Sequence, residues 1–366
     1  MIDAIASLGG LTYDSEPEKL IRGLVRKQYL RDTDPYFYVE LHFSSIGEPF
    51  SVQVKQYAMH DLFETPLALH YVGIVPASGL QFHATGHDLR HLCSQVLPAL
   101  MDKLPDSSFL AKQIGNVLER YFVLDGSIPK DRYRYLLDID PIIRDKPGYT
   151  SGLVEKIAAK ERPALAAKAL QDYIEREMFV SPDRILLYTL CIDEQLVARH
   201  PDYIQAVLDD QVSGFTKANT SLCYLTGKMS EVSADLTKFK FKYYITDKTS
   251  FSSGISGKYE SNFQLSRQAV WKVLLGERYI MNNLRLRFGA FQVYLIPEFL
   301  DNTAYDHTQM KGIVRAATGK VKSLNGLEWT SALEKLLVID QVNIRDFEGL
   351  DTRILLHFLF YEENKS

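Results

Sequence analysis

Residues 215–300 carry the feature that constrains this chain most, because basic and aromatic side chains alternate there inside a protein whose total charge is negative. The stretch holds twelve basic and six acidic side chains, a net charge of +6, while the whole chain sums to −4. The remaining residues therefore sum to −10. Localised positive charge interleaved with aromatic rings is typical of a surface that binds a phosphate backbone and stacks against bases.

Alternation within this stretch predicts strands, and a different spacing predicts a helix. Residues 238–243 read KFKFKY, and a period of two predicts a half-exposed strand over 239–243, with aromatic rings on one face and lysines on the other. Residues 284–288 and 291–296 alternate in the same way. Residues 265–275 have helical spacing, and Gly276 predicts the end of that helix.

The rest of the chain mixes both periods, which predicts an α+β protein with several subdomains. Strands are expected over residues 37–43, 50–54, 71–75 and 185–192, the first two as a hairpin-like pair. Helices are expected over residues 2–8, 88–104, 109–122, 153–160, 163–178 and 203–212. The tail predicts two further helices, over 330–338 and 352–361. The second is apolar on nearly every side, as a fully buried helix would be.

A chain of 366 residues exceeds the usual size of one hydrophobic core, so several subdomains are expected. Changes of period, together with a loop at residues 145–149, favour four segments. These are an N-terminal mixed α/β region at 1–148, a helical and strand connector at 149–214, the basic strand-rich region at 215–300, and C-terminal helices at 301–366.

Composition excludes several classes of protein. A net charge of −4 argues against a free-standing, non-specific nucleic-acid binder, but it suits a subunit that offers one basic face inside a larger assembly. Three widely spaced cysteines predict no disulfide framework and fit a reducing compartment. No signal peptide is recognisable, and no run of about 18 apolar residues predicts a membrane span. The expected location is the cytoplasm, without a membrane partner.

Four motifs follow one another in the basic stretch. Residues 223–227 read CYLTG, residues 238–251 read KFKFKYYITDKTSF, residues 263–269 read FQLSRQA, and residues 294–297 read YLIP. This order resembles the large subunit of type I-B CRISPR Cascade complexes. Members of that family carry a Cys-x-x-Cys pair, a lysine-aromatic strand leading into a T-D-K-x-x-F loop, a second Cys-x-x-Cys on a helix, and a strand running into Ile-Pro. Weaker echoes of the family occur at residues 1–9 and 187–193.

The cysteines are where this chain departs from the family. Of the four expected positions only Cys223 keeps its cysteine, and Thr226, Ser266 and Ala269 occupy the others. A structural zinc site needs four Cys or His ligands, so we expect no zinc and no other cofactor, with packing holding a degenerate zinc knuckle together. The C-terminal helical bundle of the family would begin where this chain ends, which is expected either of a truncated piece of a longer protein or of a natural short form such as a transposon-associated one.

The resemblance implies a non-catalytic subunit of an RNA-guided DNA-binding surveillance complex for antiviral defence. It implies binding to the 5′ end of a CRISPR guide RNA, recognition of the protospacer-adjacent motif (PAM) of target double-stranded DNA, and contacts with other Cascade subunits. It also implies a docking face for a helicase-nuclease or for transposition proteins. In RNA-guided recognition, base pairing reads most of the sequence, while protein reads a short flanking motif and the duplex shape.

Candidate contacts follow from the chemistry of the side chains. Lysine and arginine would neutralise phosphates, although lysines on a strand face are also typical of plain solvated surface. Base edges need donors and acceptors, which the loop at 249–253 and an asparagine pair supply, although such a pair is equally common in turns. The ring of Phe251, Tyr243 or Tyr244 would stack on a base or wedge open a base step. The expected nucleic-acid-binding residues are Lys238, Lys240, Lys242, Lys248, Ser250, Phe251, Lys258, Asn282, Asn283, Arg285 and Arg287.

Two rival functions stay open. His87 and His91, with His83 and Cys93 nearby, have the spacing of a metal site on one helical face, which would suit a metal-dependent hydrolase. However, no glutamate adjoins either histidine as a general base, and Gly86 favours a helix that starts after His83. The other rival is a purely architectural subunit that contacts only protein. Phosphate-binding loops and nucleophile elbows are missing from the sequence, so no enzymatic activity is expected.

Overall fold

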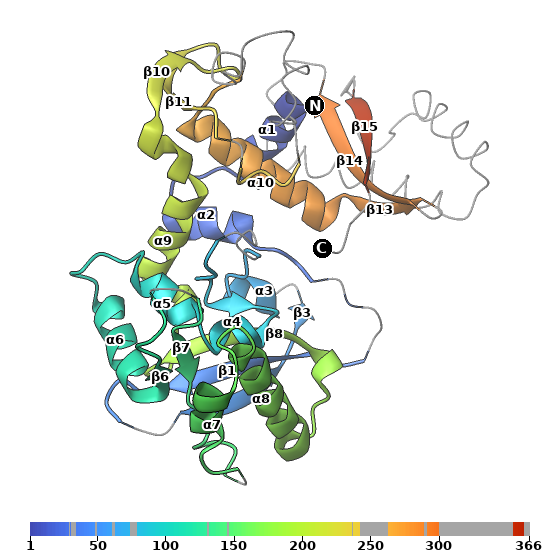
Figure 1. The fold of residues 1–366 in the computed structure, drawn as a ribbon. Coiled ribbons are helices and arrows are strands. Elements are labelled where there is room, and N and C mark those ends of the chain that lie inside the picture. The colour runs from blue at the N-terminus through green and yellow to red at the C-terminus, as the bar shows by residue number, and fades with distance from the viewer. Residues whose placement is uncertain are drawn as a thin grey trace. The chain divides into compact units, whose positions relative to one another are not determined.

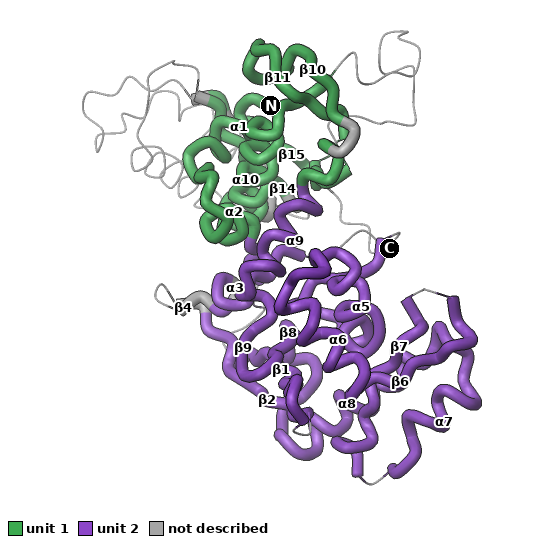
Figure 2. The backbone as a smooth tube through the Cα atoms, turned by 90° about the vertical axis from the view of Figure 1, so that its left-hand side faces the viewer, with its two compact units in different colours: residues 1–24, 212–366 green, residues 25–211 purple. Residues whose placement is uncertain are grey.

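The computed structural model describes residues 1–28, 30, 34–47, 50–60, 63–73, 79–129, 132–144, 146–235, 237–241, 263–288, 291–299 and 354–361. The chain forms two compact units (Figures 1 and 2): unit 1 is Met1–Leu24 with Val212–Ser366, and unit 2 is Val25–Gln211. The prediction of an α+β protein is confirmed. The division into four sequence segments stays a prediction.

Unit 2 is built on one mixed sheet. Its strands are β1 (Phe37–Phe43), β2 (Ser51–Gln56), β5 (Thr85–Gly86), β8 (Ile185–Ile192) and β9 (Gln195–Leu196). The strand order is β2-β1-β8-β5, with β9 paired to the end of β8. β1 runs antiparallel to β2, as the hairpin prediction requires, and parallel to β8. Both long strands are buried over most of their length, as is usual for parallel neighbours.

Helices and two small hairpins accompany this sheet (Figure 1). The helices are α3 (Thr65–Ala68), α4 (Leu89–Leu92), α5 (Val96–Met101), α6 (Phe109–Tyr121), α7 (Tyr149–Lys156), α8 (Arg162–Met178), α9 (Pro201–Gln211) and the short 3₁₀ turns η1 (Pro182–Arg184) and η2 (Val197–Arg199). The hairpins are β3 (Met59–His60) with β4 (Phe63–Glu64), and β6 (Phe122–Leu124) with β7 (Tyr135–Leu137). α6 begins after Ser108, whose hydroxyl accepts the N–H of Ala111 at 3.2 Å and so satisfies a helix-end donor.

Unit 1 is organised around the helix α10 (Arg267–Asn283). Its other elements are α1 (Ile2–Gly10), α2 (Pro17–Leu24), η3 (Ser213–Lys217), β10 (Asn219–Leu222), β11 (Met229–Ser233), β12 (Leu265–Ser266), β13 (Arg285–Phe288), β14 (Phe291–Phe299) and β15 (Ile354–Tyr361). The strands form two sheets, β10-β11-β12 and β13-β14-β15. Both α1 and α2 pack on α10, although the sequence places them in the N-terminal region. None of the described helices is long and apolar enough to cross a membrane.

Gly276 does not end α10, so that prediction is wrong, and the reason is a close contact between helices. A Cβ on Gly276 would lie 1.9 Å from the carbonyl oxygen of Ile5 in α1. A Cβ on Gly9 of α1 would lie 1.7 Å from the carbonyl oxygen of Lys272 in α10. Two helix backbones that touch in this way require glycine at both points. The glycine is therefore a packing residue inside the helix.

The helix predicted over 352–361 is also wrong, because its described residues form β15. This strand pairs antiparallel along its full length with residues 292–299 of β14. An apolar run of eight residues suits a strand as well as a buried helix, and pairing with β14 decides between them. β14 itself passes beyond its predicted end at residue 296, through Pro297. β13 pairs with β14 only as far as Tyr294, so no β13 residue lies opposite Pro297. A proline has no N–H to donate to a neighbouring strand, and it is tolerated where one side of a strand is unpaired.

Two further predictions need correction. The helix expected over 88–104 is two short helices, because Pro98 has no N–H and one continuous helix would leave the carbonyl of Ser94 without its bond. Residues 71–73 carry no strand. Residues 74–75 of that predicted strand, and the tail helix predicted over 330–338, lie outside the described part of the chain.

Candidate nucleic-acid interface

A buried carboxylate on α10 holds the lysine segment of the basic stretch. Glu277 is 2% exposed, and its two carboxylate oxygens accept the backbone N–H groups of Lys240 at 2.9 Å and Phe241 at 3.1 Å. Hydrogen bonds to an ionised acceptor in a low-dielectric interior are among the strong ones. The backbone of this segment is therefore held against α10, while Lys240 itself is exposed.

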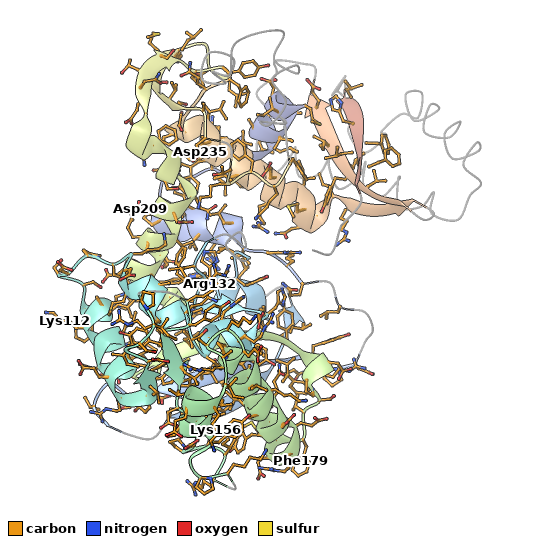
Figure 3. The ribbon with its side chains drawn as sticks, in the orientation of Figure 1. Lys112, Arg132, Lys156, Phe179, Asp209 and Asp235 are labelled. Carbon is orange, nitrogen blue, oxygen red and sulfur yellow. The ribbon has the colours of Figure 1, made fainter. Side chains whose placement is uncertain are left out.

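Aromatic rings anchor the same segment from inside. Phe239 is 1% exposed, and the ring of Phe241 packs on Tyr294 of β14 with their centroids 5.3 Å apart. Asp235, labelled in Figure 3, opens the turn before it by accepting the backbone N–H and the hydroxyl of Thr237 at 2.9 and 2.6 Å. These contacts direct the two rings inward, while Lys240 is exposed and Lys238 is half-buried.

The strand predicted over 239–243 is wrong for its described residues, 239–241. The alternation of burial is present, since Phe239 is buried and Lys240 is exposed. However, the N–H groups of this segment bond to the side chain of Glu277 instead of a neighbouring strand. A carboxylate thus takes the place of the sheet partner that an alternating pattern predicts.

Three other predicted site residues lie where α10 passes into β13. They are Asn282, Asn283 and Arg285, and the side chain of Asn283 donates to the carbonyl of Tyr279 at 3.0 Å. With a helical rise of about 1.5 Å per residue, Asn283 lies about 9 Å along the axis from Glu277. The carbonyl end of a helix carries partial negative charge, so phosphate binding there would depend on the half-buried Arg285.

Of the remaining predicted site residues, only Arg287 lies in the described part of the chain. Arg287 lies in β13, opposite Gln292 of β14. Lys242, Lys248, Ser250, Phe251 and Lys258 lie outside the described residues. The structure therefore places Lys238 and Lys240 at the middle of α10 and the asparagine pair with Arg285 at its end. The assignment of these side chains to nucleic-acid binding stays a prediction.

The four positions of the degenerate knuckle meet at the start of α10. The buried Sγ of Cys223 accepts the N–H of Ser266 at 3.3 Å and donates to its hydroxyl at 3.5 Å. The hydroxyl of Ser266 accepts the N–H of Ala269 and so caps α10. Burial raises the pKa of the Cys223 thiol, but hydrogen bonds from Thr226 and Ser266 outweigh it and lower that pKa to about 7. Hydrogen bonds thus link Cys223, Ser266 and Ala269 at the start of α10.

This set of side chains does not fit a structural zinc ion. Such an ion needs four ligands drawn from Cys, His and carboxylate groups, and only Cys223 of the four positions is one of these. Hydrogen bonds and packing hold the knuckle instead, and the ring of Tyr224 lies against Phe263 with their centroids 4.8 Å apart.

The histidines of the rival metal-site hypothesis do not share a helical face. α4 begins after Asp88, so His91 lies in the helix while His83 and His87 precede it. Their Nδ1 atoms contact, in chain order, the carbonyl oxygens of Gly73 at 2.6 Å and Leu186 at 2.7 Å, and the amide of Gln95 at 2.7 Å. Within the described residues, they form no group of three potential metal ligands. Burial lowers the pKa values of His87 and His91.

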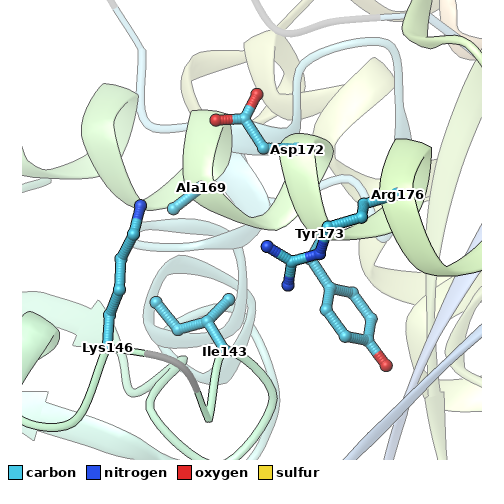
Figure 4. Close-up of a pocket in the computed structure, with 6 residues that line it drawn as sticks. All are labelled: Ile143, Lys146, Ala169, Asp172, Tyr173 and Arg176. Atoms are coloured by element: carbon cyan, nitrogen blue, oxygen red, sulfur yellow. The ribbon is translucent and has the colours of Figure 1, made fainter.

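A small pocket in unit 2 lies between α8 and the loop after β7 (Figure 4). Its lining residues are Ile143, Lys146, Ala169, Asp172, Tyr173 and Arg176. The cavity measures about 20 Å³, which is room for about one water molecule. A nucleotide does not fit there, so we assign no ligand site to it.

Sequence reasoning missed Glu277, the residue that holds the lysine segment. A signal was available, because Val273, Leu274 and Ile280 surround it at helical spacing and are all buried. A carboxylate in the middle of an apolar helix face needs a partner. Sequence reasoning also missed the exposed apolar tip of the β10–β11 hairpin, where Leu222 pairs with Met229 and the two are 55% and 67% exposed.

Comparison with known families adds a separate line of evidence. Residues 220–366 match the family described as CRISPR-associated protein TM1802, central domain. The matched residues include the knuckle, the segment bound by Glu277, and the whole of α10. Comparisons with curated proteins and with solved structures gave no match. The family match supports a CRISPR-associated function for this protein.

Proposed function

We propose that this chain is a non-catalytic subunit of an RNA-guided DNA-binding complex of the Cascade kind. It would bind the 5′ end of the guide RNA and recognise the PAM of the target duplex. Other Cascade subunits, and a helicase-nuclease or transposition proteins, would be its protein partners. The type I-B large subunit is the role that fits this description.

The observation that carries the proposal is that the basic stretch and the family match fall on nearly the same residues. The net charge of +6 falls on residues 215–300, in a chain that sums to −4. The match to a CRISPR-associated family covers residues 220–366, nearly the whole of that stretch and the tail after it. A basic surface on a protein of this class suits RNA or DNA, because the phosphate backbone provides most of the affinity of such complexes.

The described contacts suggest a division of roles. Lys238 and Lys240 are carried by a segment that Glu277 binds through its backbone, so they would meet a phosphate backbone with little cost of ordering. Phosphate contacts set register, whereas base contacts specify sequence. We therefore assign backbone binding to the lysines and arginines, and base reading to Asn282, Asn283, Ser250 and Phe251.

Co-purification tests the class of function, and charge reversal tests the surface. The chain, expressed with the other subunits of its complex, should carry an RNA of uniform length. The double variant Lys238→Glu/Lys240→Glu should bind target DNA roughly tenfold more weakly and lower the salt slope by about two, because two phosphate contacts are lost.

The matched control is Lys112→Glu/Lys168→Glu, which makes the same charge change at exposed positions on α6 and α8 (Lys112 is labelled in Figure 3). It should leave both affinity and slope nearly unchanged. Equal losses in the two double variants would mean that net charge alone matters. Assembly without RNA, unaffected by either variant, would favour the purely architectural alternative.

A further inference from the structure

A buried group of potential metal ligands lies on one face of the sheet in unit 2. Glu40 and His42 of β1 are 2% and 7% exposed, and Cys191 of β8 is 1% exposed. One ligand atom from each lies within 4.8 Å of the others. The strand register explains the grouping, because His42 is opposite Cys191 and residues two apart on a strand point to the same face.

The surroundings of His42 resemble those of a metal-bound imidazole. Its Nε2 lies 2.8 Å from Glu40 Oε2, inside the group. Among the residues that the structure describes, its Nδ1 has no hydrogen-bond partner, and the carboxylate of Glu194, at the exposed turn after β8, is 3.5 Å away. In metal sites one ring nitrogen of a histidine binds the ion, while the other donates to an outer carboxylate that orients the ring.

Lys55 occupies the place where a cation is needed. Its Nζ lies 2.7 Å from Glu40 Oε2, and its side chain is 45% exposed. The ammonium compensates the buried carboxylate of Glu40 while no metal is bound. A long side chain that is nearly half exposed can turn outward to water when another cation arrives.

We propose that Glu40, His42 and Cys191 form a binding site for a divalent transition-metal ion of the zinc class. The ligand atoms would be a carboxylate oxygen of Glu40, Nε2 of His42 and Sγ of Cys191, with a water in the fourth position. A thiolate together with an imidazole selects zinc or its neighbours over magnesium and calcium. The site is separate from the knuckle and does not depend on the proposed nucleic-acid function.

Charge and geometry are consistent with this assignment. Two positive charges on the ion balance one carboxylate and one thiolate, whose proton is released to water on binding. Ligand atoms around a tetrahedral zinc ion lie about 3.4–3.8 Å apart, given bonds of about 2.0–2.3 Å. The separations of up to 4.8 Å in the present group therefore require shifts of about 1 Å.

Metal titration of the full chain tests the site. The purified protein, stripped with a chelator, is titrated with Zn²⁺ and separately with Co²⁺, whose thiolate charge-transfer absorption reports a cysteine ligand. We expect one equivalent to bind and the absorption to appear. Cys191→Ser should weaken Zn²⁺ binding at least tenfold and abolish the absorption. Cys93→Ser and Cys223→Ser, which remove the other two buried thiols, should change neither.

A second variant keeps all three ligands and so does not depend on whether Cys191→Ser folds. Lys55→Met removes the cation that competes for Glu40, and we expect it to bind Zn²⁺ about tenfold more tightly or better, because like-charge repulsion is lost. The proposal is overturned if neither the natural chain nor Lys55→Met binds a stoichiometric ion. It is equally overturned if the cobalt absorption follows Cys223 or Cys93 instead of Cys191.

Discussion

At the scale of single residues, Glu277 shows that a buried carboxylate can hold a lysine-bearing segment in place. A carboxylate without partners in an apolar interior would cost several kcal/mol. Here it receives the N–H groups of Lys240 and Phe241, which in turn have no strand to pair with. Glu277 therefore lowers the net positive charge of the basic stretch but also holds the segment that carries Lys240.

This arrangement leads to a prediction that runs against simple electrostatics. Glu277→Ala raises the net charge by one, yet we expect nucleic-acid binding to weaken roughly threefold or more, because the lysine segment loses its attachment. Two unsatisfied N–H groups should also lower the free energy of unfolding by about 2–3 kcal/mol. Fluorescence anisotropy and urea unfolding measure the two effects. Glu231→Ala removes an exposed carboxylate of β11 and should strengthen binding slightly; a similar gain for Glu277→Ala would contradict this role.

Cys223 gives a prediction about pH. Its folded pKa of about 7 is below the ordinary value of 9.0, so the folded state binds its proton less tightly than the unfolded state does. The stabilisation is fully present above about pH 9 and is lost as pH falls through 7. Relative to Cys223→Ser, the natural chain should therefore gain about 2 kcal/mol of unfolding free energy between pH 7 and 9. Cys93→Ser is the control, because burial raises the pKa of Cys93 beyond this window. A difference that does not change with pH would contradict the assignment.

At the scale of elements, sequence patterns predicted those elements that local interactions determine. α6 has its capping Ser108, α8 has Pro163 in its first turn, β1 alternates branched or aromatic residues with polar ones, and β8 is mostly apolar, so each could be predicted from its own residues. The errors occurred where a distant segment decides. β15 is a strand because β14 is beside it, and residues 239–241 lack a strand because Glu277 binds their N–H groups.

The candidate site was predictable to a similar degree. The chemistry of Lys238 and Lys240, and the resemblance of the positions of Cys223, Thr226, Ser266 and Ala269 to a motif of paired cysteines, can be read from the sequence. The contact of Lys240 with Glu277, and that of Ser266 with Cys223, each join residues that are tens of positions apart in the sequence. Both contacts therefore depend on how the chain folds back onto α10. No local pattern contains that information.

Contact between α1 and α10 gives a prediction at this scale. Gly276→Ala and Gly9→Ala each place a methyl group within 2 Å of a backbone oxygen, so the helices must separate. We expect each substitution to destabilise unit 1 by about 3 kcal/mol or more, as severe overpacking does. Gly115→Ala in α6 has no atom within 4 Å of the new methyl group and should instead stabilise the protein by about 0.5–1 kcal/mol. Thermal unfolding distinguishes these results, and three equal effects would mean that the contact is not as close as described.

At the scale of the whole molecule, charge is divided between the two units. Counted over the sequence, unit 2 has 20 basic and 26 acidic side chains, a net charge of −6, and unit 1 has 22 and 20, a net charge of +2. A polyanion would therefore be attracted to unit 1 and repelled by unit 2. The same division explains how a chain with an acidic total can still contain one unit of net positive charge.

Unit 1 is also discontinuous, since residues 1–24 pack on a helix that begins at Arg267. The apolar side chains buried from α1 and α2 include Ile5, Leu8, Leu20 and Ile21. Burial contributes about 1.5–3 kcal/mol for each such side chain, which together is comparable to the whole stability of a typical domain. A chain that lacks residues 1–24 should therefore lose the cooperative unfolding of unit 1 and keep that of unit 2, as calorimetry and limited proteolysis would show.

Adding residues 1–24 back as a separate peptide should restore the lost transition, because the missing contacts are between side chains and need no covalent link. A peptide with Ile5→Asp should fail, since it would bury a charge against α10. The DNA affinity of the full complex should fall when residues 1–24 are deleted, recover with the natural peptide, and stay low with the Ile5→Asp peptide. The reason is that Glu277 positions the lysines only while α10 is packed. Unchanged unfolding and unchanged affinity after deletion of residues 1–24 would show that α10 needs no N-terminal partner, and would contradict the grouping of these residues into one unit.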